Sequence, residues 1–138
     1  MGLFDKLAGS GSSKLAPKSA LALAALTMIG ADGAVEDEEM DGLRRIVRGD
    51  DEAFRVAFRI YKDKNINECV SLVSNVLSDR QKVATIANLL DLAMADGMLA
   101  GAEKRLLEAY MSNFGIDEEI VKTIIEVIAI KNDFSIFE

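Results

Sequence analysis

The 138-residue chain contains no histidine, no tryptophan, one cysteine and one proline. Because zinc sites in proteins are built mainly from histidine and cysteine, the chain lacks the ligands for an ordinary zinc centre. The single cysteine, Cys69, cannot form a disulfide within the chain, which agrees with a reducing compartment. A nucleophile elbow, a phosphate-binding loop and a dinucleotide-binding fingerprint are also missing, so we expect a protein that is not an enzyme.

Long apolar segments and an excess of positive charge are absent as well. The apolar stretch at residues 20–29 is about half as long as a helix that crosses a bilayer. The N-terminus lacks the apolar core of a secretory signal, so we expect a cytoplasmic protein. The formal net charge of −7 repels nucleic acid and anionic lipid, which leaves cations or a basic protein as the favoured partners.

The composition and the apolar spacing both favour helices. Half of the residues are apolar, and alanine and leucine are abundant. Apolar residues at helical spacing, bounded by capping residues and glycines, predict seven helices and no strand of useful length. The expected helices cover residues 17–31, 36–48, 51–62, 65–77, 79–95, 102–114 and 118–130, the fourth starting at Asn65 or Asn67. We therefore expect one compact all-α domain over residues 17–138.

Residues 1–16 differ in character from the rest of the chain and are predicted to be a flexible N-terminal segment. Residues 2–8 form a short amphipathic piece, and residues 9–13 are a linker of glycine and serine. The plainer interpretation is a terminus without fixed structure. The alternative is a weak contact with a membrane surface or a partner through Leu3, Phe4 and Leu7.

One acidic motif occurs twice, at a constant offset of 64 residues. The first copy has Asp32, which is followed directly by glycine, and then Glu39. The second copy has Asp96, again followed by glycine, and then Glu103. The same order of helix, Asp-Gly turn, helix, glycine stop and helix surrounds both copies. This repeat predicts two similar units related by an approximate two-fold axis.

The repeated acids have two interpretations. Each aspartate follows the last turn of a helix, where the helix dipole disfavours it by about 0.3–1 kcal/mol. The plainer interpretation is that the aspartates form turns and the glutamates cap or complement the following helices. The alternative is that both turns lie side by side. In that case Asp32, Glu39, Asp96 and Glu103 would form an oxygen-rich site for a hard divalent cation, Ca²⁺, Mg²⁺ or Mn²⁺.

The two copies are not equal in charge. Glu36, Asp37 and Glu38 of the first copy align with the uncharged residues 100–102 of the second. The predicted site is therefore lopsided. Glu36 or Glu38 is either an additional ligand or part of a solvated acidic first turn. The spacing also differs from that of an EF-hand, which needs glycine at its sixth position and glutamate at its twelfth.

These motifs carry a resemblance to a known family. Ala-Asp-Gly, an apolar residue two positions after the glycine, and glutamate seven positions after the aspartate, written twice in a small acidic helical chain, resemble the TerB-like tellurite-resistance proteins. The first six residues, MGLFDK, are also similar to the start of some members. The resemblance covers roughly residues 15–130.

The resemblance implies a function as well as a fold. It implies the TerB-like helical fold, metal binding at these acidic positions, and a non-enzymatic role with a protein partner in a stress or tellurite-resistance system. The rival hypothesis is a metal-free helical scaffold whose acidic patch contacts a basic protein.

Overall fold

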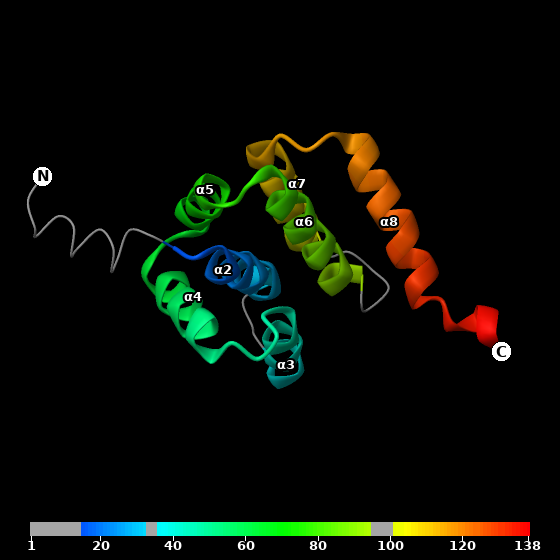
Figure 1. Ribbon diagram of the computed structural model, residues 1–138, viewed down its shortest axis with the longest axis horizontal. Helices are drawn as coiled ribbons and strands as arrows, with labels where there is room; N and C mark the ends of the chain where they lie inside the picture. The colour runs from blue at the N-terminus through cyan, green and yellow to red at the C-terminus, as the bar shows by residue number, and fades with distance from the viewer. Residues whose placement is uncertain (1–14, 33–35, 95–100) are drawn as a thin grey trace, which may run out of the picture.

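The computed structural model describes residues 15–32, 36–94 and 101–138 (Figure 1). These residues form seven α-helices and two 3₁₀ turns, and they contain no strand. The elements are α2 (Pro17–Ile29), η2 (Gly30–Asp32), α3 (Asp37–Ile46), α4 (Asp51–Asp63), α5 (Ile66–Val76), α6 (Asp79–Met94), α7 (Gly101–Phe114), α8 (Glu118–Asn132) and η3 (Phe134–Phe137). The all-α prediction is confirmed. Nowhere in the described residues is a helix both long and apolar enough to cross a membrane.

Capping contacts begin two of the helices where the sequence predicts. The Asn65 carbonyl oxygen Oδ1 accepts a hydrogen bond from the Glu68 backbone N–H at 2.8 Å, so α5 uses the first of its two candidate starts. At α6, the Ser78 backbone N–H donates to Gln81 Oε1 at 2.8 Å, and the Gln81 N–H donates to Ser78 Oγ at 3.3 Å. This is the predicted capping box, which satisfies donors that the first helical turn leaves unpaired.

Three helix ends differ from the prediction by two residues. Helix α2 stops at Ile29, two residues early, because the tighter turn η2 replaces its last turn. Helix α3 stops at Ile46 rather than at residue 48. Arg48 and Gly49 adopt positive φ angles of 58° and 76°, which a right-handed helix cannot contain. Helix α8 continues to Asn132, beyond its predicted end at residue 130. The turn η3 follows it, in a segment for which the sequence predicts no helix or strand.

The internal repeat is visible in the structure. Helices α2, α3 and α4 correspond to α6, α7 and α8, with α5 joining the two units. Gly49 and Gly115 both take positive φ, at 76° and 68°, after the middle helix of each unit. Asp50 then caps α4 and Asp117 caps α8. The second unit has one additional residue, Ile116, between its glycine and its cap.

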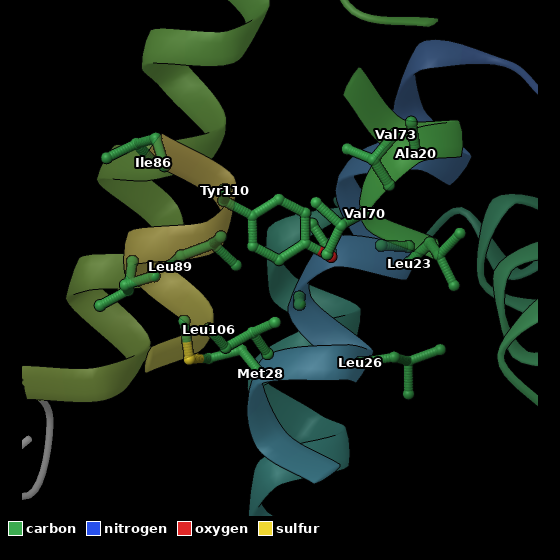
Figure 2. Close-up of a cluster of buried hydrophobic side chains, with 14 of the residues drawn as sticks. Ala20, Leu23, Leu26, Met28, Val70, Val73, Ile86, Leu89, Leu106 and Tyr110 are labelled. Atoms are coloured by element: carbon green, nitrogen blue, oxygen red, sulfur yellow. The ribbon is translucent and has the colours of Figure 1, made fainter. Parts of the chain in front are cut away.

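Helix α2 lies at the centre of the bundle (Figure 1). It packs against α3, α4, α5, α6 and α7, and ten of its 13 residues are buried. A helix that is covered on every side must be apolar all round, which explains its Ala- and Leu-rich sequence. Figure 2 shows α2 contributing Leu23, Leu26 and Met28 to a cluster with side chains from α5, α6 and α7. The apolar stretch at residues 20–29 is thus almost wholly buried within the bundle.

Cys69 belongs to the same core. Its side chain is only 1% exposed, and this burial raises the pKa of the thiol. Because the thiolate is the reactive form, a higher pKa makes the side chain less nucleophilic. Cys69 therefore acts as a small buried hydrophobic residue.

Replacing Gly30 or Gly42 by alanine should change the free energy of unfolding in opposite directions. A Cβ atom at Gly30 would overlap the hydroxyl of Tyr61, so Gly30→Ala should lower the free energy of unfolding by about 1–3 kcal/mol. A Cβ atom at Gly42, inside α3, would lie 3.7 Å from Leu92 Cδ2, which is an ordinary contact. Because alanine also favours the helix, Gly42→Ala should raise the same free energy by about 0.5–1 kcal/mol.

Urea denaturation of both variants beside the wild type measures these changes. If both variants changed the free energy of unfolding in the same direction, the contacts described for Gly30 and Gly42 would be contradicted.

Candidate functional site

The structure describes two of the four predicted cation ligands in full. Glu39 is the third residue of α3 and Glu103 is the third residue of α7, and both side chains are partly buried. Asp32 ends η2, but its side chain and the whole of Asp96 lie outside the described residues. The geometry of the site is therefore built from the two glutamates and their surroundings.

Glu39 and Glu103 line the same pocket, although they are 64 residues apart in the sequence. The pocket has a volume of about 390 Å³ and lies where α2, α3, α6 and α7 meet. Its lining consists of Met28, Ile29, Glu36, Glu38, Glu39, Gly42, Arg45, Leu92 and Glu103. Apolar side chains of α2 and α6 thus adjoin four carboxylates from α3 and α7.

The order of the helices explains why Glu39 and Glu103 line the same pocket. Helices α2 and α6 pack against each other. Met28 and Ile29 near the end of α2 line the same pocket as Leu92 near the end of α6, so the two helices end close together. Helix α3 follows the first and α7 follows the second, and η2 packs against α7. The starts of α3 and α7 are therefore brought to one place by the repeat itself.

One oxygen of Glu39 has a structural role. The backbone N–H of Glu36 donates a hydrogen bond to Glu39 Oε1 at 3.0 Å, at the start of α3. The plainer interpretation of Glu39, a helix-capping contact, is thus confirmed. A carboxylate has two oxygens, so this contact does not exclude cation binding by the same side chain.

The acidic first turn of α3 contributes to the pocket as well. Glu36 and Glu38 are exposed, and both line the pocket beside Glu39. Among the described residues of the second unit, Glu103 alone adds a carboxylate to this lining. Among the described residues, the pocket is therefore lined by three carboxylates from the start of α3 and its N-cap, and by one from α7.

Among the charged residues described around the pocket, Arg45 is the one that the sequence did not indicate. Its side chain lines the pocket together with the carboxylates and supplies positive charge there. A spacing of three residues separates Glu39, Gly42 and Arg45, which places them on one face of α3. That spacing is the signal that could have identified Arg45.

The carboxylates around the pocket have the chemistry that a hard cation requires, but their described arrangement does not complete a metal site. All the candidate donors are carboxylate oxygens, which Ca²⁺, Mg²⁺ and Mn²⁺ prefer. Within residues 15–32, 36–94 and 101–138, no group of three or more acidic or cysteine side chains is arranged to hold a metal ion. The described carboxylates therefore do not form a complete cation site by themselves.

The fold and the repeat agree with one comparison. A family model described as "Tellurite resistance protein TerB" matches residues 18–126. The matched span includes both copies of the acidic motif, helices α2 to α7 and the first half of α8. Comparisons with curated proteins and with solved structures find no match.

Proposed function

Because the chain belongs to the TerB family of tellurite-resistance proteins, we propose that it is a non-enzymatic module that binds a divalent cation and a protein partner. The proposed cation ligands are Asp32, Glu39, Asp96 and Glu103. The observation that supports this proposal is the pocket that Glu39 and Glu103 share. The proposed setting is a stress-response or tellurite-resistance system.

Electrostatics gives a physical reason for a cation. The N-cap and first turn of α3 carry four consecutive acids, residues 36–39, and Glu103 of α7 joins three of them at the pocket. Neighbouring carboxylates repel one another unless positive charge neutralises them. Arg45 supplies one such charge, and a divalent cation would supply two more. A bound cation would also connect α3 of the first unit to α7 of the second.

Calorimetric titration of chelator-treated protein with Ca²⁺, Mg²⁺ and Mn²⁺ tests the site. We expect at least one cation to bind the wild type. Glu39→Gln and Glu103→Gln should each weaken that binding by about tenfold or more, because the number of charged ligands sets the affinity. Asp32→Asn and Asp96→Asn should have the same effect.

The chain contains a matched control for Glu39. Glu68 Oε1 accepts the Asn65 backbone N–H at 3.2 Å, which is the same capping contact at the start of α5. Glu68 does not line the pocket. Glu68→Gln should therefore leave cation binding unchanged, because it removes the same charge at an equivalent helix start, where glutamine still accepts the capping hydrogen bond as Gln81 does. Equal losses in Glu39→Gln and Glu68→Gln would show that the loss of a negative charge at a helix start, and not ligation, underlies the effect.

The alternative function is a cation-free interaction scaffold. It is favoured by Arg45, which already places a positive charge among the carboxylates. Under this alternative, none of the three cations binds the wild type or raises its melting temperature. The acids would then act only in turns, in caps and in contact with a basic partner.

A further inference from the structure

Exposed apolar side chains gather at the C-terminal end of the chain. Eight large hydrophobic side chains are exposed among the described residues, and seven of them lie between residues 120 and 137. Those seven are Ile120, Ile125, Val127, Ile130, Phe134, Ile136 and Phe137. Single exposed apolar residues are normal, but a concentration of this kind marks an interaction surface.

Helix α8 has two apolar faces. Val121 and Ile128 are buried, and α8 packs against α6. Ile120, Val127 and Ile130 follow a spacing of seven and three residues, which places them along a second side of the helix. Val127 is 59% exposed and Ile130 is 65% exposed. Figure 1 shows α8 at the edge of the bundle, beside α6.

The turn η3 adds two exposed aromatic side chains directly after α8. Phe134 and Phe137 are 71% and 78% exposed, and their ring centroids lie 6.3 Å apart. Figure 1 shows η3 beyond the end of the bundle. We call Ile120, Val127, Ile130, Phe134 and Phe137 the outer face. Four of these five residues lie beyond residue 126, where the family match ends.

Acidic side chains flank the outer face. Glu119 and Glu126 each precede an apolar residue of the face by one position, so they run along one edge of it. Residues 118–138 contain five acidic and two basic side chains. One of the basic side chains, Lys131, pairs with Asp91 of α6 at 3.3 Å. The outer face is therefore an apolar stripe with an acidic edge.

We propose that the outer face binds a basic amphipathic helix of a protein partner. Such a helix would place apolar residues at heptad spacing on the stripe and lysine or arginine beside Glu119 and Glu126. A second copy of the chain is disfavoured, because the acidic edges beside the two outer faces would repel each other. This proposal specifies the partner surface of the proposed function and does not depend on the cation.

Two synthetic three-heptad peptides test the proposal by fluorescence anisotropy with the full chain. Both carry leucine at positions a and d; the basic peptide has lysine at e and g, and the acidic peptide has glutamate there. We expect the basic peptide to bind at least about tenfold more tightly than the acidic peptide. Glu119→Lys combined with Glu126→Lys should reverse that preference.

A polar substitution locates the binding surface. Val127→Asn combined with Ile130→Asn should weaken binding of the basic peptide by about tenfold or more. Ile66→Asn is the matched control, because Ile66 is 40% exposed but lies on α5, outside the outer face. All these positions are exposed, and circular dichroism verifies that the variants remain folded.

Several outcomes would overturn the proposal. Equal binding of both peptides would do so, as would unchanged binding in the Val127→Asn, Ile130→Asn variant. Sedimentation that shows a dimer of the wild type and a monomer of this variant would assign the face to a second copy. Pelleting of the wild type, but not of this variant, with phosphatidylcholine vesicles would assign the face to a membrane. Cation titration of the same variants separates a failure here from a failure of the cation site.

Discussion

Leu23→Ala is expected to lower the free energy of unfolding by about 2–5 kcal/mol, the largest effect of any single substitution considered for this protein. Leu23 is fully buried in the middle of α2, within the cluster shown in Figure 2. Five helices surround α2, so the neighbouring side chains are held in place and cannot collapse into the space left by the missing atoms. The lost transfer energy and the remaining cavity therefore add.

Leu21→Ala provides the comparison. Leu21 belongs to the same helix, and its side chain is only partly buried. The same atoms are removed and the same helix propensity is gained, so the difference between the two variants reports packing alone. Urea denaturation followed by far-UV circular dichroism measures both, with the wild type alongside. Similar losses for Leu21→Ala and Leu23→Ala would contradict the central position of α2.

Thr27→Val is expected to lower the free energy of unfolding by about 1–3 kcal/mol, although valine has nearly the shape of threonine. The Thr27 hydroxyl donates to the Ala24 carbonyl oxygen at 2.7 Å. Since this uses its only hydrogen, the Tyr110 hydroxyl must be the donor in the 2.6 Å contact with Thr27 Oγ1. Burial raises the pKa of Tyr110, so its hydroxyl stays protonated. Valine would leave that buried donor without an acceptor.

A double-mutant cycle tests this interpretation. Tyr110→Phe removes the donor while Thr27 keeps its bond to Ala24, so the expected loss is smaller, about 0.5–1.5 kcal/mol. With Tyr110→Phe already present, Thr27→Val has no donor to strand, and the double variant should lose less than the sum of the single losses. Strictly additive losses in thermal denaturation would mean that this bond does not couple α2 of the first unit to α7 of the second.

The local parts of this fold could be predicted from the sequence because their causes are local. Asn65 and Ser78 accept hydrogen bonds from backbone groups only three residues away. Gly49 and Gly115 allow the positive φ that ends a helix. Such interactions depend on neighbours in the chain, so the order of the helices and the repeat of three of them were predicted correctly. The ends of α2 and α3 were predicted less well, because tight turns there shorten both helices.

The candidate site was predictable only in part. The constant offset of 64 residues places Glu39 and Glu103 at the same position of two equivalent helices, the third residue of α3 and of α7. It cannot establish that the two positions share a pocket, because that depends on α2 and α6 packing together. Arg45 was missed for the same reason, since a basic residue in the last turn of a helix is ordinarily explained by the helix dipole.

The sequence by itself determined an acidic, all-helical chain with a duplicated motif, because composition, periodicity and caps act within a few residues. Tertiary packing alone decided which apolar side chains are covered. Helix α8 carries apolar residues at helical spacing on two sides, and the spacing does not distinguish Val121 and Ile128 from Val127 and Ile130. Packing against α6 buries the first pair and leaves the second pair exposed, because one neighbouring helix can cover only one side of α8.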